Sequence, residues 1–314
     1  MTNQEIQWET PPCSWCGSTS VEPVFSGPDR LERLPGTFHM ARCPKCGLYR
    51  QSPRPAWDSL KNYYPEDYVA YQYDARSRNP ILDYVKRYGN IKRRRAIEAF
   101  QPGGELLEVG CGTGNFLREM QATGRWNCTG IEPSQVAADH ARKTLQIPIH
   151  HGRFEDVELA QESFDVVMMV CVLEHLADPV RDIQRTHGLL KKGGWFVFTV
   201  PNFESLERKV FGEYWSGWDL PRHLYIYPRP VLQKLMEENG FRIVARKCLA
   251  SSYHVLRHSF DFWSQTWEEK HLTAKRLLMK GYNSWVTRLA LMVPLALADR
   301  LNLSTNITFF AQKQ

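Results

Sequence analysis

The sequence lacks several features that would place it in a specialised class of protein. No stretch reaches the roughly 18 uninterrupted apolar residues that a membrane-spanning helix needs. The nearest approach, residues 289–298, is interrupted by Pro294. The first residues, MTNQEIQWETPP, carry neither the basic start nor the apolar centre of a secretory signal peptide. There is also no internal repeat and no low-complexity tract. We therefore expect a cytoplasmic protein.

The composition is that of an ordinary globular protein, and 314 residues suit two domains. Hydrophobic residues make up 43% and charged residues 24%, which excludes a collagen-like, coiled-coil or wholly disordered chain. The net charge of +6 is compatible with an anionic substrate or surface but does not require one. The basic run at residues 92–95 allows two interpretations, a binding patch or a solvated helix face, and such runs are more often the second.

Four of the eight cysteines form two Cys-x-x-Cys pairs, Cys13 with Cys16 and Cys43 with Cys46. Two intervening residues let one tight turn present both sulfur atoms to a single tetrahedral ion, and a glycine follows each pair. The spacing predicts a four-thiolate site for a structural Zn²⁺ in a small ribbon. A redox dithiol and two reducible disulfides are the alternatives. The other four cysteines lie among apolar residues and are expected to be small buried side chains: Cys111, Cys128, Cys171 and Cys248.

From residue 105 onward, short apolar runs alternate with helical stretches. This order predicts an α/β fold with a mostly parallel sheet that is covered by helices on both faces. A helix is expected over residues 81–100, and an ordered connector with a short helix over the Pro- and Tyr-rich residues 52–74. The expected strands are residues 106–109, 126–131, 164–170, 195–200, 241–248 and 307–311.

The first of these strands leads into a glycine loop, in which Gly110, Gly112 and Gly114 follow the acidic Glu108. A dinucleotide-binding loop would need its third glycine at position 115, which is an asparagine, so hydride transfer is disfavoured. Twenty-two residues past Gly110, the second strand ends at Glu132. A carboxylate at this place can accept two hydrogen bonds from the hydroxyl groups of a ribose.

Taken together, the segments ELLEVGCGTGNF, GIEPS, FDVVMMVCVLEHLADP and LKKGGWFVFTVPN resemble the class I S-adenosylmethionine-dependent methyltransferases in order and spacing. The resemblance covers roughly residues 90–314. It implies a Rossmann-like, seven-stranded sheet. We expect a zinc ribbon over residues 1–52, a connector and helix over 53–95, and a methyltransferase domain over 96–314 with a helical insertion at about 250–304.

The resemblance also implies which residues bind S-adenosylmethionine. The three glycines would line its methionine part, Glu132 would hold the ribose, and the segment beginning at Arg153 would contact adenine, although the family's usual acid is absent at that position. The full set of expected cofactor contacts is Glu108, Gly110, Gly112, Gly114, Asn115, Phe116, Glu132, Pro133, Phe154, Glu155, Cys171 and Leu173. After the fourth strand, His175 is either a catalytic residue or a histidine that only satisfies the strand end.

Residues 214–224 crowd three aromatic side chains, an acid, an arginine and a histidine into one loop after the fifth strand. A base near the acceptor assists methyl transfer to a hydroxyl or an acidic carbon, and histidine has a suitable pKa. We expect His223 to be that base or to orient the acceptor, with support from Asp219 or Arg222; the alternative is that it only fixes the loop. The expected acceptor contacts are Tyr214, Trp215, Trp218 and Arg222.

The ribbon, the YYPEDY connector and the PRHL stretch resemble a narrower group of bacterial methyltransferases of sugar, polysaccharide and secondary-metabolite pathways. A small-molecule, sugar, glycan or lipid-linked acceptor is therefore expected. An RNA methyltransferase with a zinc finger is the alternative, but residues 13–46 hold four basic and three acidic side chains, which does not favour nucleic acid. A non-catalytic cofactor-binding protein is a third. The helices of residues 250–304 pack on the core or on a dimer partner, or make peripheral contact with a membrane.

Overall fold

The computed structural model describes residues 5–65, 80–249, 252–267, 272–282 and 284–314. They belong to two compact units, each made of three segments of the chain. The cysteine unit comprises Met1–Tyr63, Pro201–Leu232 and Ala250–Ile307, and the sheet unit comprises Tyr64–Val200, Gln233–Leu249 and Thr308–Gln314. Each compact unit combines segments from distant parts of the sequence, so these units do not test the domain boundaries expected at residues 52 and 95. Those boundaries stay a prediction.

The sheet unit contains a seven-stranded sheet, which confirms the predicted α/β class. Its strands run parallel from β8 through β7, β6 and β9 to β10, while β12 and β13 pair antiparallel. In spatial order the strands are β12 (Phe241–Lys247), β13 (Asn306–Lys313), β10 (Leu190–Pro201), β9 (Phe164–Val170), β6 (Gly104–Val109), β7 (Trp126–Glu132) and β8 (Ile149–His151). The direction of winding reverses between β6 and β9, and ligands of such sheets bind at this switch point.

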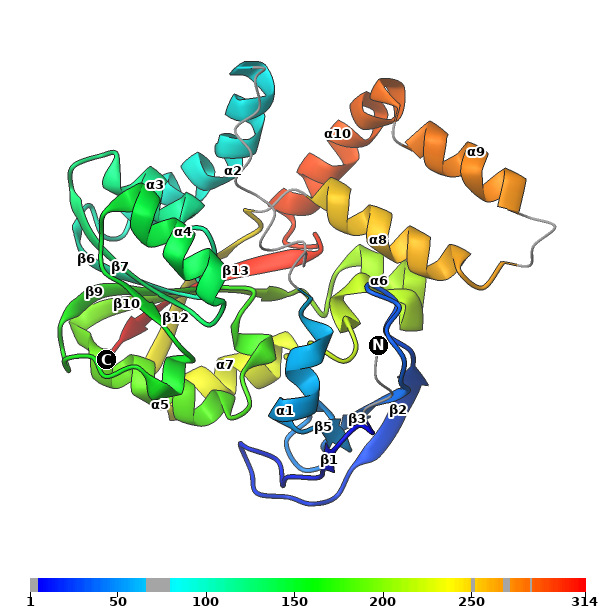
Figure 1. The fold of residues 1–314 in the computed structure, drawn as a ribbon, viewed down its shortest axis with the longest axis horizontal. Coiled ribbons are helices and arrows are strands. Elements are labelled where there is room, and N and C mark those ends of the chain that lie inside the picture. Colours follow the sequence, from blue (N-terminus) through cyan, green and yellow to red (C-terminus); the bar gives the residue numbers. More distant parts are fainter. Residues whose placement is uncertain (1–4, 66–79, 250–251, 268–271, 283) are drawn as a thin grey trace. The chain divides into compact units, whose positions relative to one another are not determined.

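Helices cover both faces of this sheet, with α3 and α4 on one side and α5 on the other (Figure 1). They are α2 (Pro80–Glu98), α3 (Asn115–Gln121), α4 (Gln135–Leu145), α5 (Pro179–Leu189) and α7 (Arg229–Glu238). Sequence features explain where two of them begin. The Ser134 side chain accepts a hydrogen bond from the amide of Ala137 and caps α4, while Asp178 caps α5, in which Pro179 occupies the first turn.

The cysteine unit is built around a four-stranded sheet whose strands come from distant parts of the sequence. Its spatial order is β11 (Tyr225–Ile226), β4 (Tyr49–Gln51), β3 (Phe38–Arg42) and β2 (Glu22–Gly27). A second, two-stranded sheet pairs β1 (Trp8–Glu9) with β5 (Arg54–Pro55). Because β11 follows the loop at residues 214–224, the chain after β10 returns to complete the four-stranded sheet of the N-terminal segment.

A short helix follows β5, as expected for the connector: α1 (Trp57–Leu60) continues into a 3₁₀ turn, η1 (Lys61–Tyr63). The rest of the predicted connector, residues 66–74, lies outside the described residues. An aromatic cluster buries this turn together with strands of both origins. Its members are Phe38, Met40, Tyr63, Trp215, Trp218, Leu220 and Ile226. The N-terminal ribbon and residues 214–226 therefore share one hydrophobic core.

Three helices of the described chain lie in the region where the helical insertion is expected, and the insertion as a domain feature stays a prediction. They are α8 (Ser252–Ser264), α9 (Leu272–Tyr282) and α10 (Trp285–Arg300), and α6 (Leu206–Phe211) packs against α8. Two 3₁₀ turns, η5 (Gly212–Tyr214) and η6 (Ser216–Trp218), follow α6. Among the helices that the structure describes, none is long and apolar enough to cross a membrane.

Candidate functional site

The glycine loop after β6 has a left-handed backbone at each of its three glycines. The φ angles of Gly110, Gly112 and Gly114 are +72°, +54° and +79°, a region in which other residues are strained. Space is also limiting, since a Cβ atom on Gly110 would lie 2.6 Å from a methyl carbon of Val172. The loop ends where α3 begins at Asn115. Glycine at these positions therefore lets the backbone turn tightly at the switch point of the sheet.

Glu132, at the end of β7, is held against this loop. Its carboxylate accepts hydrogen bonds from the amides of Gly112 and Ser134, each at 2.8 Å, and its side chain is nearly fully buried. Burial raises the pKa of Glu132, and the two amide bonds oppose that rise. Each carboxylate oxygen keeps a further lone pair after accepting one amide. The carboxylate is thus fixed in place and able to accept two neighbouring hydroxyl groups.

Glu108 and Arg93 lie in the same region of the sheet unit. Glu108 is buried, burial raises its pKa to about 8 against the favourable charge of Arg93, and its Oε2 has no hydrogen-bond partner among the described residues. The guanidinium of Arg93 lies 5.5 Å from the ring centre of Phe116 and donates to Asn90. The basic run at residues 92–95 is therefore not a uniformly solvated face. The inward orientation of Arg93 could have been found from the apolar periodicity of α2.

The residues expected near adenine have partners in the sheet unit. Phe154 is buried at the start of η3 (Phe154–Asp156), and the guanidinium of Arg185 lies 5.0 Å from its ring centre. Glu155 forms an ion pair with Arg153. Among the remaining expected contacts, Phe116 and Leu173 are buried, Asn115 and Cys171 are half-buried, and Pro133 is exposed. Their contact with a cofactor stays a prediction.

His175 ends the 3₁₀ turn η4 (Leu173–His175), and its Nδ1 lies 3.0 Å from the hydroxyl of Tyr64. The sequence analysis did not find Tyr64, because 111 positions separate the two residues. The hydrogen bond orients the imidazole ring, which is half-buried. This arrangement suits either a positioned functional histidine or a satisfied structural one, so the role of His175 stays a prediction.

The four cysteines of the two Cys-x-x-Cys pairs come together in the cysteine unit, with their sulfur atoms all within 4.8 Å of one another. Cys13 and Cys46 have sulfur atoms 3.6 Å apart, and Cys16 and Cys43 have theirs 3.5 Å apart. Four thiolates around one tetrahedral Zn²⁺ at about 2.3 Å would be about 3.8 Å apart.

The two turns that carry these cysteines also have the same backbone. The amide of Gly17 donates to the carbonyl of Cys13 at 2.8 Å, and the amide of Gly47 donates to that of Cys43 at 2.9 Å. Both glycines have a left-handed φ, +70° and +79°. Two matching turns that converge on one point are typical of a closed metal site, and the described sulfur positions fit one.

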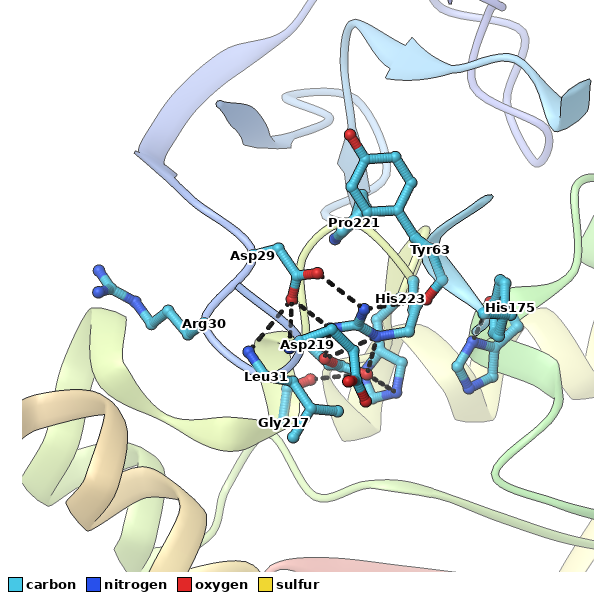
Figure 2. A network of polar contacts seen from close by, with 12 residues as sticks. Asp29, Arg30, Leu31, Tyr63, His175, Gly217, Asp219, Pro221 and His223 are labelled. Carbon is cyan, nitrogen blue, oxygen red and sulfur yellow. Dashed lines mark hydrogen bonds and ion pairs between the residues drawn. The ribbon is translucent and has the colours of Figure 1, made fainter. Parts of the chain in front are cut away.

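An ion-pair network holds the loop at residues 214–224. Arg222 is fully buried, and its Nη2 donates to Asp29 at 2.6 Å and to Asp219 at 2.7 Å. Its Nη1 donates to the carbonyl of Tyr63 at 3.2 Å. Figure 2 shows Asp29, on the N-terminal ribbon, and Asp219, on the loop, close together within this network. Both residues expected to support His223 therefore have structural partners, and Asp29 was not found from sequence.

His223 is buried beside this network. Its Nδ1 lies 2.8 Å from the carbonyl oxygen of Gly217, which can only accept, so Nδ1 carries the proton. Burial lowers the pKa of His223 below its ordinary 6.5, against the favourable charge of Asp219. The ring is therefore neutral near pH 7, and Nε2 is its basic nitrogen. Gln51 fixes the same loop by donating to the carbonyls of Pro221 and His223, each at 2.8 Å.

The aromatic residues of the loop pack inside the cysteine unit. Trp215 and Trp218 belong to the aromatic cluster and are 1% and 6% exposed, and their rings meet edge to face. Tyr214 is half-buried, with the guanidinium of Arg30 4.6 Å from its ring centre. Packing accounts for the two tryptophans and for Arg222, so their contact with an acceptor stays a prediction. Tyr214 and Arg30 are the more accessible pair.

Comparison with known proteins relates the chain to methyltransferases. A family described as "Methyltransferase domain" matches residues 74–246. The chain is 38% identical over 184 residues to a ubiquinone biosynthesis O-methyltransferase of Ruegeria pomeroyi, which covers 54% of this chain and 73% of the relative. It is 29% identical over 197 residues to one of Coxiella burnetii, which covers 58% and 78%. The cysteine pairs lie outside the family match.

The fold is also similar to a solved methyltransferase structure. Phosphoethanolamine N-methyltransferase 2 of Haemonchus contortus, in complex with S-adenosyl-L-methionine, superposes with a TM-score of 0.52 and 19% identity. The similarity covers 85% of this chain and 62% of that one. At this identity it supports the fold, namely the Rossmann-like sheet that the sequence predicts.

Replacing Gly110 by alanine should weaken cofactor binding. The new Cβ atom would meet Val172 at 2.6 Å, and a left-handed φ costs alanine about 1–2 kcal/mol. We expect the affinity for S-adenosylhomocysteine, measured by isothermal titration calorimetry, to fall at least roughly tenfold. Gly89→Ala is the matched control, because a Cβ atom at this position in α2 has no neighbour within 4 Å. Wild-type affinity in Gly110→Ala would exclude the loop from the cofactor site.

Replacing Asp29 by asparagine should destabilise the cysteine unit. The substitution keeps the shape of the side chain but removes one of two charges that compensate the buried Arg222. We expect the free energy of unfolding to fall by about 3 kcal/mol, measured by urea titration with tryptophan fluorescence. Asp58→Asn removes a solvent-exposed ion pair with Lys61 and should change little. Equal effects of the two substitutions would contradict a stabilising role for the buried pair.

Proposed function

Because the chain belongs to the class I S-adenosylmethionine-dependent methyltransferases, we propose that it methylates a small-molecule acceptor at a hydroxyl group. Support for a small molecule comes from the ubiquinone biosynthesis O-methyltransferases that it resembles in sequence. Sugar, glycan and lipid-linked hydroxyls belong to the same chemical class of acceptor. The observation that carries the proposed binding of S-adenosylmethionine is the carboxylate of Glu132, which is fixed beside the glycine loop.

The residues of the sheet unit fit the chemical groups of S-adenosylmethionine. Glu132 would accept hydrogen bonds from the ribose, and the glycine loop would allow close approach of the backbone. The buried, unpartnered Oε2 of Glu108 is suited to an ammonium group, and the half-buried guanidinium of Arg93 to a carboxylate. The cofactor, when bound, supplies an electrophilic methyl group. The protein then has to align the acceptor and remove its proton.

We propose that His223 removes this proton. A hydroxyl acceptor loses its proton as its oxygen forms the new bond to carbon, and Nε2 of a neutral imidazole can accept it. The hydrogen bond from Nδ1 to Gly217 supports this role, because it fixes the tautomer that leaves Nε2 basic. Tyr214 and Arg30 are suited to contact the acceptor. His175 is a second candidate for orienting it.

The four cysteines are proposed to hold a structural Zn²⁺. Their thiolates would fill all four positions of a tetrahedral ion, which would leave none for a substrate. Strand β4 begins two residues after the Gly47 turn, and it pairs directly with β11 at the end of the 214–224 loop. The ion would therefore support the proposed acceptor loop through the ribbon, and would take no part in the chemistry.

The metal can be tested by removing one ligand. The purified protein should contain about one zinc per chain by inductively coupled plasma mass spectrometry. Cys43→Ser should lose it and unfold the cysteine unit at a lower temperature. Cys128→Ala, which changes a buried cysteine of the sheet unit, should keep the metal. A wild-type protein whose mass shows two disulfides in place of bound zinc would contradict the site.

The methyl transfer and the role of His223 can be tested in one assay. The protein is incubated with S-adenosylmethionine carrying a ¹³C- and ³H-labelled methyl group and a cell extract separated into small-molecule, lipid, glycan and RNA fractions. Label is expected in a non-nucleic-acid fraction, with the ¹³C chemical shift of a methyl ether, and a reaction without the protein serves as the blank. Label in RNA, or on nitrogen or carbon, would overturn the proposed acceptor.

With that labelled fraction as substrate, His223→Asn is the informative variant. Asparagine can still donate to the Gly217 carbonyl and hold the loop, but it cannot act as a base. We expect kcat to fall roughly 100- to 10,000-fold. The wild-type rate should decline as the pH falls below the lowered pKa of His223, because protonated Nε2 accepts no proton, and this decline should vanish in the variant. A variant with the wild-type rate and pH profile would leave His223 a purely structural role.

A further inference from the structure

The helices α9 and α10, with the residue directly after α10, form a part of the cysteine unit in which large apolar side chains are concentrated at the surface. Of the seventeen exposed large apolar side chains in the described residues, eight lie between residues 277 and 301. They are Leu277, Leu278, Val286, Leu289, Met292, Val293, Leu297 and Leu301. Isolated exposed apolar residues are common on protein surfaces, but a concentration of this kind indicates a surface that contacts something else.

The exposed apolar residues of α10, together with Leu301 directly after its end, form one continuous face of the helix. Val286, Leu289, Val293, Leu297 and Leu301 are separated by three or four residues, which places them along one side. The opposite side is the one that packs in the cysteine unit, where α10 contacts α8. Ala298 on that side is buried, and Leu291 and Leu295 are half-buried. The helix is therefore apolar on both sides, and only one side has a partner in the described chain.

Basic residues accompany this face. Residues 272–301 contain five lysines and arginines and one acidic residue, Asp299. Asp299 accepts a hydrogen bond from the hydroxyl of Ser304 at 2.5 Å, whereas Lys280 and Arg300 are exposed. An apolar helix face with an excess of basic residues complements the acyl chains and anionic headgroups of a lipid surface.

We propose that the α9–α10 face, defined by the eight apolar residues above, binds to the surface of an anionic lipid bilayer. A second copy of the chain fits less well. A two-fold contact through this face would bring the same basic segments of both copies together, and like charges would then repel each other in the interface. On a bilayer, the same residues meet headgroups of the opposite charge. The proposal goes beyond the proposed methyl transfer and does not depend on it.

Flotation with lipid vesicles tests this proposal without cofactor or acceptor, so its outcome is separate from that of the activity assay. The full-length protein is mixed with vesicles of phosphatidylcholine alone, or of phosphatidylcholine and phosphatidylglycerol in equal parts. We expect it to float with the mixed vesicles, to remain largely unbound with the neutral ones, and to dissociate at high salt. A wild-type protein that stays unbound with the anionic vesicles would overturn the proposal.

Two variants identify the surface. Val293→Ser with Leu297→Ser should reduce the partition onto the mixed vesicles by roughly tenfold or more, because both apolar side chains lose their contact with acyl chains. Val210→Ser is the matched control, since Val210 is 75% exposed on α6 in the same unit and should bind as the wild type does. Lys280→Glu with Arg300→Glu leaves the apolar face intact and should abolish the preference for anionic lipid.

Unchanged thermal unfolding midpoints would show that each variant is folded. Binding of the Val293→Ser/Leu297→Ser variant at the wild-type level would exclude the α9–α10 face as the lipid contact. Sedimentation equilibrium tests the alternative, in which a second copy of the chain binds this face. A wild-type dimer that fails to bind vesicles and dissociates in this variant would assign the face to self-association and overturn the proposal.

Discussion

The cysteine unit depends on the burial of one guanidinium group. Arg222 has no exposed surface, so its charge is stable only because Asp29 and Asp219 lie within hydrogen-bond distance. One carboxylate comes from the N-terminal ribbon and the other from the loop that follows the large sheet. The oxygen of Asp29 that meets Arg222 also accepts the amides of Leu31 and Glu32, so the turn of the ribbon is ordered around the same carboxylate. The pair therefore specifies how the ribbon and the loop fold together.

This joint folding connects the N-terminal ribbon to the loop at residues 214–224 by strand pairing and packing. A closed four-thiolate site cannot bind a substrate, and a separate ribbon would serve only as an appendage. Here β4 of the ribbon pairs with β11, Gln51 fixes two carbonyls of the loop, and the aromatic cluster takes members from both segments. Stability supplied by a metal at Cys13 and its partners would thus reach residues 214–224 through hydrogen bonds and packing.

The sequence was informative wherever the interacting groups are close along the chain or repeat with a period. Six of the seven strands of the large sheet and the helix before them could be located, because periodic runs of apolar residues are a local property, whereas the three-residue strand β8 was too short to be recognised. The cysteine pairs could be recognised because their spacing is also a local property. The partners of Arg222 and His223 could not, since Asp29 and Gln51 lie 193 and 172 positions away and follow no pattern. The inward orientation of the half-buried Arg93 was missed because only the charge of residues 92–95 was considered, without the helical period around them.

The two roles considered for His223, fixing the loop and accepting a proton, would use different nitrogen atoms of its ring. The Nδ1 proton is used in the bond to Gly217, which holds the loop. That same bond decides the tautomer, and burial keeps the ring neutral, so the opposite nitrogen remains a base at the pH where hydroxyl groups need one. The proposed proton transfer at Nε2 is therefore compatible with the hydrogen bond at Nδ1 that fixes the loop. A substitution that preserves one function and removes the other separates them, whereas alanine would remove both.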